Sequence, residues 1–340
     1  MKIAIVGAGA IGGYAGVKLA LAGERVTFLA RGANLAAIRE RGFRLIQSDD
    51  TELAARDVQA TADYEAAGPQ DVVLLAVKTH QLAAVAEAVP RLFGPETLVV
   101  TMQNGIPYWY FHRHGGPHEG HCVAAVDPAG VCLRLIPPER VIGCVVYPAA
   151  VLVAPGVVRH IEGNRFPVGE LDGSASARVR AISESFVRAG LQAPVLDNIR
   201  AEIWLKLWGN LTFNPISALT RATLVDICQY PPTRKLAAEM MAEAQSVAQK
   251  LGITFRLPIE RRIAGAERVG KHKTSMLQDL EAGRVMETDA LLGSVLELAR
   301  MTETAAPAIE AVYALTKLLG QSVAASGPAG GATAAPAERG

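Results

Sequence analysis

Short runs of aliphatic and β-branched residues alternate with longer amphipathic stretches through the first half of the chain. The runs predict strands at Lys2–Val6, Arg25–Leu29, Asp71–Val77 and Thr97–Met102. The stretches between them carry apolar residues at the three- and four-residue spacing of a helix. Because strands that alternate with helices build parallel βαβ units, the pattern predicts an α/β fold with a doubly wound sheet.

A second strand-rich segment follows, and the pattern changes near Asp197. Strands are expected at Val141–Pro148, Val157–Ile161 and Arg165–Val168, and we expect them to extend the first sheet as antiparallel strands. Beyond Asp197 the helical patterns are long and rich in Ala, Leu, Glu and Arg, with no convincing strand. The second domain is therefore predicted to be entirely helical.

The length of the chain favours two domains. At 340 residues it exceeds the usual size of a single hydrophobic core. We predict a sheet domain at 1–196 and a helical domain at 197–322. Residues 323–340 are expected to form a disordered tail, because Ala, Gly, Pro and Ser largely replace the apolar side chains that a core needs.

Charge and composition exclude several kinds of partner. The chain has 34 Lys and Arg against 33 Asp and Glu, so we expect no basic surface for nucleic acid. It has no uncharged apolar run of about 18 residues, the length that would predict a membrane span. The four cysteines lack the spacing of a disulfide framework or a zinc site. We expect a cytoplasmic protein that binds neither nucleic acid nor membrane.

A glycine-rich turn follows the first predicted strand. Its three glycines have the spacing of the dinucleotide-binding fingerprint, and an apolar-periodic helix follows whose N-terminal amides can bind phosphate. The alternative is a tight turn that needs glycine only for its own geometry. We predict a Rossmann-like domain in which the whole turn binds the cofactor: Gly7, Ala8, Gly9, Ala10, Ile11 and Gly12.

Arg31 stands at the end of the second predicted strand, where an Asp or Glu would bind a free ribose hydroxyl. A carboxylate there would repel a 2′-phosphate, whereas a guanidinium offers it two hydrogen bonds. The alternative is a solvated surface charge. The residue predicts NADPH rather than NADH as cofactor, with Asn34 as an assisting residue.

Polar residues follow two further strands. Lys78 comes after Asp71–Val77, and Asn104 comes after Thr97–Met102. Ligands of a doubly wound sheet bind at the carboxyl ends of its strands, so both residues are candidates for contact with cofactor or substrate. Asn104-Gly105 is equally typical of a structural turn.

A polar stripe marks the helix that begins near Asn198. Glu202, Lys206, Asn210 and Asn214 stand four residues apart, so they share one slowly turning face of the helix. A Glu202–Lys206 ion pair on a solvated face is the simpler interpretation. Asparagine is a poor helix former, however, which favours a polar, partly buried site. Pro215 is expected to end or kink this helix.

These segments resemble one known family, the 2-dehydropantoate 2-reductases, also called ketopantoate reductases. The resemblance covers almost the whole chain except the tail and rests on the order and spacing of five segments. They are Gly7–Gly12, Val77-Lys78, Gln103-Asn104-Gly105, Arg200–Pro215, and Thr274–Asp279 followed by Glu287-Thr288-Asp289.

The resemblance implies a Rossmann domain, a helical domain with an active-site cleft between the two, and NADPH-dependent reduction of a 2-keto acid. The first candidate is ketopantoate, reduced to pantoate for pantothenate synthesis. Lys206 matches the catalytic lysine, which can donate a proton to the developing alkoxide. Glu287 matches its partner acid. The positions that match residues near substrate or cofactor are Asn104, Asn210, Asn214, Ser275 and Lys78.

The chain departs from the family pattern after Asn104. Residues 106–121 are rich in aromatic side chains and contain His112, His114, His118 and His121. Glycines and a proline interrupt any helix that would align these histidines, so we expect no metal site. A bulky loop beside the expected cleft favours an alternative, a paralogous reductase of a different 2-keto acid.

A second alternative is a regulator that binds NADPH without catalysis. Lys206 and Glu287 argue against this alternative, because a protein without catalysis has no need of a proton-donating lysine and its partner acid. Apolar helical faces are compatible with a homodimer and equally with a domain core. The expected partner is a small 2-keto acid.

Overall fold

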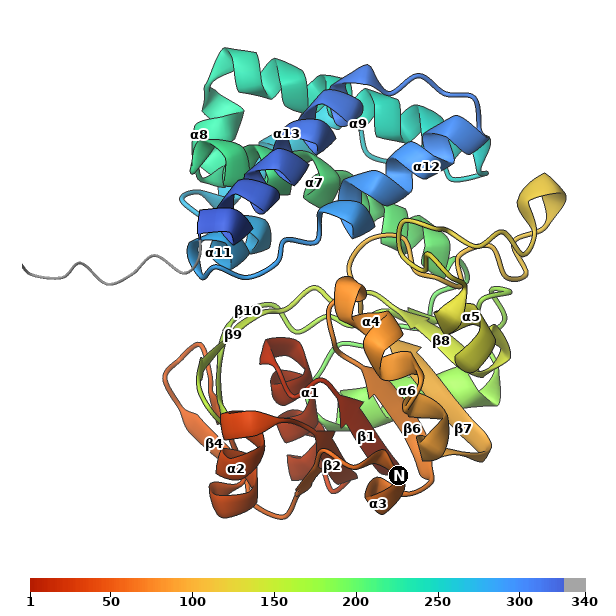
Figure 1. The fold of residues 1–340 in the computed structure, drawn as a ribbon, viewed down its shortest axis with the longest axis vertical. Coiled ribbons are helices and arrows are strands. Elements are labelled where there is room, and N and C mark those ends of the chain that lie inside the picture. Colours follow the sequence, from red (N-terminus) through yellow and green to blue (C-terminus); the bar gives the residue numbers. More distant parts are fainter. Residues whose placement is uncertain (327–340) are drawn as a thin grey trace, which may run out of the picture. The chain divides into compact units, whose positions relative to one another are not determined.

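The computed structural model describes residues 1–326, and the chain divides into two compact units (Figure 1). The first is Met1–Leu207, and the second begins at Trp208. The division falls within helix α7 (Ile199–Thr220), whereas the sequence pattern places the boundary at 196/197. The first turns of α7 count with the first unit because their side chains hydrogen-bond to it, as described below.

The first unit is built on a seven-stranded sheet with the order β11-β8-β7-β6-β1-β2-β5. All neighbours are parallel except β11, which is antiparallel to β8. Four central strands carry buried aliphatic residues on both faces, as helices on both sides of a parallel sheet require. The strands are β1 (Lys2–Val6), β2 (Arg25–Leu29), β5 (Gln59–Thr61), β6 (Gln70–Leu75), β7 (Phe93–Thr101), β8 (Val141–Cys144) and β11 (Val168–Gly169).

A separate four-stranded sheet has the order β4-β3-β10-β9. The prediction that the later strands all extend the first sheet with antiparallel pairing is therefore wrong in part. Only β8 and β11 join that sheet, and β8 does so in parallel, because its partner β7 runs in the same direction. The four strands are β3 (Phe43–Ile46), β4 (Glu52–Ala55), β9 (Ala149–Ala154) and β10 (Val157–Glu162).

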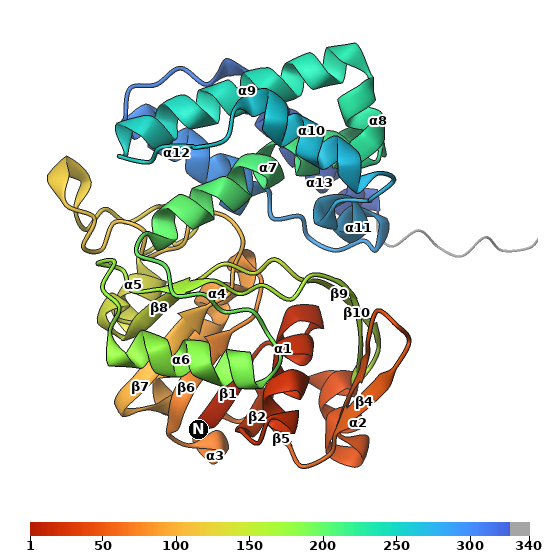
Figure 2. The ribbon, with the colours of Figure 1, turned by 180° about the vertical axis from the view of Figure 1, so that it is seen from behind.

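Helix α1 packs against both sheets. A Cβ on Gly13 would stand 2.5 Å from the Phe43 ring of the small sheet, and one on Gly16 would stand 2.4 Å from the Phe28 ring of the large sheet. Helices α4 and α6 lie on opposite sides of the large sheet (Figures 1 and 2). The helices are α1 (Ala10–Leu21), α2 (Gly32–Arg41), α3 (Tyr64–Ala67), α4 (Thr79–Ala86), α5 (Val131–Leu135) and α6 (Ala177–Arg188), with short 3₁₀ turns η1 (Val89–Leu92), η2 (Gly116–His118) and η3 (Pro138–Arg140).

In its described residues the second unit has helices joined by loops and no strand, and the expected α/β fold with a helical C-terminal domain is confirmed. Trp208 of α7 is fully buried there and donates from Nε1 to the Met241 carbonyl oxygen at 2.8 Å. Besides α7, the elements are α8 (Leu224–Gln229), α9 (Pro231–Lys250), α10 (Ile259–Val269), α11 (Ser275–Glu281), the π-helical turn η4 (Asp289–Gly293), α12 (Ser294–Met301) and α13 (Pro307–Ser326).

Two predictions for this half of the chain need correction. Of the two outcomes expected at Pro215, an end or a kink, the end is not found: helix α7 continues to Thr220, and residues on both sides of the proline are buried. Helix α13 includes residues 323–326, which were assigned to a disordered tail; its Val-Ala-Ala sequence propagates the helix readily. The rest of the predicted tail, 327–340, lies outside the described residues.

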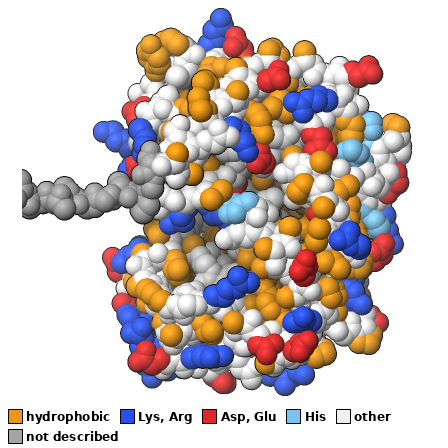
Figure 3. All heavy atoms as spheres, in the orientation of Figure 1, with side chains coloured by type: hydrophobic (Ala, Val, Ile, Leu, Met, Phe, Trp, Pro, Cys, Tyr) orange, Lys and Arg blue, Asp and Glu red, His pale blue; other side chains and the backbone are white. Residues whose placement is uncertain are grey.

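Surface charge and hydropathy agree with the composition. Basic and acidic side chains are interspersed over the face drawn in Figure 3. Within residues 1–326 no helix combines the length and the apolar character that crossing a bilayer requires.

Candidate active site

The glycine turn lies directly after β1 at the carboxyl end of the parallel sheet. Gly7 has a φ of +105°, and a Cβ there would stand 2.8 Å from the Val77 backbone nitrogen. A Cβ on Gly12 would stand 2.1 Å from the Gly7 carbonyl oxygen. Both positions therefore require glycine, because the backbone on each side approaches too closely for any side chain.

The space beside the turn fits a phosphate group. In contrast to Gly7 and Gly12, Gly9 has no atom within 4 Å of the place where a Cβ would stand. It is the N-cap residue of α1, and the first turn of that helix has no acidic residue. An open approach to a helix N-terminus is what a dinucleotide pyrophosphate requires. The residues present therefore fit a nicotinamide dinucleotide.

Arg31 and Asn34 have different surroundings. Arg31 is the N-cap residue of α2, and it is exposed, so a ligand can reach its guanidinium. Asn34 is engaged within the fold: its Nδ2 donates to the Ala8 carbonyl oxygen at 2.5 Å, and its Oδ1 accepts from the Gly156 amide at 2.7 Å. Asn34 thus braces the glycine turn against the turn between β9 and β10.

The chain changes direction across the sheet between β1 and β6, since β2 lies on the other side of β1. Ligands of doubly wound sheets bind at this switch point. Lys78 follows β6 there, as the N-cap residue of α4. Gln103, which follows β7, donates from Nε2 to the carbonyl oxygens of Leu75 at 2.7 Å and Val77 at 3.0 Å. Gln103 therefore ties the ends of β6 and β7 together.

Lys206 joins this edge of the sheet from α7. Its Nζ donates to the Asn104 Oδ1 at 2.7 Å and to the Val146 carbonyl oxygen. The Asn104 carbonyl oxygen in turn accepts from the Thr79 hydroxyl at 3.3 Å. The fold thus brings together two predicted site residues that are 102 positions apart in the chain. Asn104 is more than a turn residue, because its side chain holds the ammonium.

Glu202 lies one turn before Lys206 on α7, yet its contacts lead elsewhere. Its Oε1 accepts from the Tyr147 hydroxyl at 2.8 Å and from the Arg165 guanidinium. The Tyr147 ring is close to two cations: its centre is 5.9 Å from Lys206 Nζ and 5.1 Å from the Arg165 guanidinium carbon. The polar stripe is therefore not explained by a Glu202–Lys206 ion pair, because each of the two residues binds groups outside the helix.

Two other titratable groups near Lys206 are neutral at neutral pH. Burial raises the pKa of the Cys144 thiol to about 12, although the charge of Lys206 opposes this shift. Burial and the Glu202 carboxylate raise the pKa of Tyr147 well above its usual value. Neither side chain therefore places a negative charge beside the ammonium in the physiological range.

The other predicted site residues belong to the second unit. Asn214 is buried, and its Nδ2 donates to the Ser275 hydroxyl at 3.4 Å, so α7 and the start of α11 meet at these two residues. Asn210 lies one turn earlier on α7 and is half-buried. Glu287 is also half-buried and precedes the π-helical turn η4, a distortion that is frequent at functional sites.

The aromatic residues of the loop 106–121 are part of the core of the first unit. Tyr108, Trp109, Tyr110 and Phe111 are at most 2% exposed. Trp109 Nε1 donates to the Thr101 hydroxyl at 2.9 Å. Their burial gives these large side chains a packing role in the fold.

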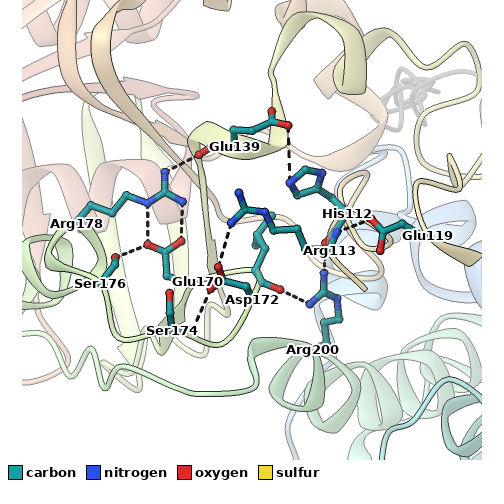
Figure 4. Close-up of polar contacts among 11 residues, drawn as sticks. His112, Arg113, Glu119, Glu139, Glu170, Asp172, Ser174, Ser176, Arg178 and Arg200 are labelled. Atoms are coloured by element: carbon teal, nitrogen blue, oxygen red, sulfur yellow. Dashed lines mark hydrogen bonds and ion pairs between the residues drawn. The ribbon is translucent and has the colours of Figure 1, made fainter. Parts of the chain in front are cut away.

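Arg200, in the first turn of α7, anchors this loop. Its guanidinium donates to the carbonyl oxygens of Tyr110 at 2.7 Å, Leu171 at 2.6 Å and His112. Figure 4 shows it beside the ion pair of Arg113 with Asp172, whose atoms are 3.0 Å apart. Burial lowers the pKa of Arg200, which marks its desolvated surroundings.

The histidines of the loop surround a ring. The imidazoles of His114, His118 and His121 lie 5.0, 6.0 and 5.5 Å from the Phe111 ring centre. With a phenyl ring between them, they are not arranged around a shared ligand position. Among residues 1–326, no three His, Cys, Asp or Glu side chains gather as metal ligands would.

Several residues near the predicted site gave little signal in the sequence. Val146 contributes a backbone carbonyl, which no side-chain pattern reveals. In the sequence, Tyr147 precedes β9 and Arg165 follows β10, and only the fold brings the two side chains to Glu202. Tyr147 was not selected as a residue that follows a strand, because the predicted strand Val141–Pro148 included it, whereas β8 ends three residues earlier at Cys144.

Comparison with known proteins finds ketopantoate reductases similar to this chain over almost its whole length. The family model described as "Ketopantoate reductase PanE/ApbA" matches residues 3–173, and "Ketopantoate reductase PanE/ApbA C terminal" matches residues 198–320. A 2-dehydropantoate 2-reductase of Mesorhizobium japonicum is 54% identical over 94% of this chain and 98% of its own length. One of Pyrococcus horikoshii is 30% identical over 93% and 97%. A crystal structure of a candidate ketopantoate reductase from Ralstonia solanacearum is 43% identical over 94% and 98%, with a TM-score of 0.91.

Proposed function

The chain belongs to the ketopantoate reductase family, and from this premise we propose that it reduces 2-dehydropantoate to pantoate with NADPH, with Lys206 as general acid. The observation that supports the proposal most directly is the 2.7 Å hydrogen bond from Lys206 Nζ to Asn104 Oδ1. It holds an ammonium at the carboxyl edge of the sheet, where ligands of this fold bind.

The proposed chemistry suits these groups. The nicotinamide, when bound, supplies a hydride to the keto carbon. Negative charge then grows on the carbonyl oxygen, and the Lys206 ammonium stabilises that charge and donates its proton to the oxygen. Asn104 and the Val146 carbonyl orient the ammonium, and both are uncharged acceptors that leave its positive charge available.

The cofactor assignment uses separate residues. Gly9 and the N-terminus of α1 would bind the pyrophosphate, and the exposed Arg31 would bind the 2′-phosphate of NADPH. Lys78, at the switch point, would supply a further positive charge to the cofactor. The preference for NADPH rests on Arg31.

Assignments in the second unit rest on the family resemblance. Glu287 is the proposed partner acid, and Asn210, Asn214 and Ser275 are the proposed substrate-binding residues. The 3.4 Å contact between Asn214 and Ser275 supports a shared role for that pair. Neutral donors and acceptors of this kind can orient a hydroxyl and a carboxylate without adding charge.

The test is a substrate panel with purified protein. NADPH oxidation is followed with ketopantoate and with other 2-keto acids, both smaller and aromatic, and NADPH binding is measured in parallel by fluorescence. We expect kcat/KM to be highest for ketopantoate. A higher value for another acid would indicate the paralogous reductase, and binding of NADPH without turnover of any acid would indicate the regulator.

A further inference from the structure

Glu202 and Lys206 have the spacing and the order that favour an ion pair on a helix, with the acid one turn before the base. Such a pair would compete with Asn104 for the ammonium. In the structure Asn104 Oδ1 accepts from Lys206 at 2.7 Å, while Glu202 is 12% exposed and accepts from groups on the β-strand side of the unit. Something must therefore direct the carboxylate away from the lysine.

We propose that Arg165 and Tyr147 are positioning residues that keep Glu202 engaged, so that Lys206 stays on Asn104 and the Val146 carbonyl. Arg165 neutralises the carboxylate through its guanidinium. The Tyr147 hydroxyl binds the same oxygen, Oε1, at 2.8 Å, and the centre of the Tyr147 ring is 5.9 Å from the Lys206 ammonium. The inference rests on the proposed role of Lys206 in proton donation.

The covalent chain links these contacts. Tyr147 follows Val146 directly, so the bond from its hydroxyl to Glu202 also holds the Val146 carbonyl against α7. Arg165 packs on the same ring, with 5.1 Å between guanidinium carbon and ring centre. The cluster of Tyr147, Arg165 and Glu202 thus has two effects. It holds the Val146 carbonyl, an acceptor of the Lys206 ammonium, and it keeps the Glu202 carboxylate from competing for that ammonium.

Arg165→Gln leaves Glu202 without its cation. On the same face of its own helix, Lys206 stands one turn away. We expect kcat to fall about tenfold, the cost of drawing a charged donor from its acceptor, with little change in the KM for NADPH. The basic limb of the pH profile of kcat should move to higher pH, because a carboxylate at the ammonium favours its charged form.

The double variant Arg165→Gln, Glu202→Gln decides the question. Without the competing carboxylate, kcat should return to within about threefold of the parent value, and the pH limb should return with it. A double variant that is as slow as Arg165→Gln would overturn the proposal. Arg165→Lys, which keeps the charge, should retain most of the activity and covers the case in which Arg165→Gln does not fold.

Two controls separate this inference from the proposed function. Arg159→Gln breaks a comparable surface pair, that of Arg159 with Asp50, and should leave kcat unchanged. Lys206→Ala is assayed beside the other variants. Full turnover by Lys206→Ala would overturn the proposed general acid itself, whereas loss of turnover there without rescue in the double variant would overturn only the positioning role.

Discussion

The first half of helix α7 carries two cations, Arg200 and Lys206, which make similar hydrogen bonds but are expected to have different roles. Arg200 and Lys206 both donate to backbone carbonyls of the first unit. All three acceptors of Arg200 are carbonyl oxygens from two separate segments, at Tyr110, His112 and Leu171. The acceptors of Lys206 include the Val146 carbonyl and the side chain of Asn104, which follows the end of a strand.

The difference follows from the two head groups. A guanidinium is planar, has five donors in fixed directions and keeps its proton, so it suits the joining of several chain segments. An ammonium is compact, and it can give up its proton within the range that enzymes use. Arg200 should therefore contribute mainly to stability and Lys206 mainly to turnover, and each substitution below tests that division.

Lys206→Ala should have the largest effect. Loss of a general acid lowers kcat by about 10²- to 10⁴-fold, while the free energy of unfolding should change by less than about 1 kcal/mol. Steady-state kinetics and urea unfolding of the same preparation measure the two quantities. Lys206→Arg is the matched control, because it keeps the charge but holds its proton too tightly to donate it. Unchanged turnover in Lys206→Ala would end the assignment.

Arg200→Met should show the opposite profile. Three carbonyl oxygens lose a charged donor, so the free energy of unfolding should fall by about 3–4 kcal/mol. Arg200→Lys keeps the charge but not the fork of donors, and it should recover part of the loss. Chemical denaturation measures the effect, and kcat per folded molecule at low temperature should stay within about threefold. A large fall in kcat with full stability would contradict the division.

The sheet edge was predictable because its signals are local. Gly7 to Gly12, the strand before that turn and the helix after it carry their own geometry in adjacent residues, and Lys78 and Asn104 simply follow strands. The second sheet was not predictable in the same way. Strand β10 pairs with β3, more than 100 positions earlier, and the alternation of apolar residues in a strand does not identify its partner.

The same limit applies to the aromatic loop. Tyr108 to Phe111 have a composition that is compatible with a pocket wall or a core, and only the tertiary contacts with Arg200 and Trp204 decide between them. Pro215 shows the converse: a strong local preference to end a helix yields to burial of the residues around it. Glu202 and Lys206 also needed the fold, because their partners come from segments that are distant in the sequence.

Arg31 extends the comparison to a cation that is exposed and available to a ligand. Arg31→Asp replaces an attraction for the 2′-phosphate by a repulsion, and the ratio of kcat/KM for NADPH to that for NADH should fall by about 30- to 100-fold. Stability should not change measurably. Kinetics with both cofactors test this, and Arg39→Asp, on the same helix α2, is the control. An unaltered ratio would mean that another residue binds the 2′-phosphate.

Tyr110→Phe gives the smallest effect and refines the structural half of the comparison. The Tyr110 carbonyl accepts from Arg200, while its hydroxyl accepts from Trp204 Nε1 at 2.7 Å, on the same helix between Arg200 and Lys206. Trp204 is fully buried, so the substitution leaves its N–H without this acceptor and should lower the free energy of unfolding by about 1–2 kcal/mol. Because Trp204 lies only two residues before Lys206, turnover is the informative readout. If kcat stays unchanged while stability falls, the loop anchors α7 without tuning the lysine; a parallel fall in kcat would show that the two cations are coupled through the helix.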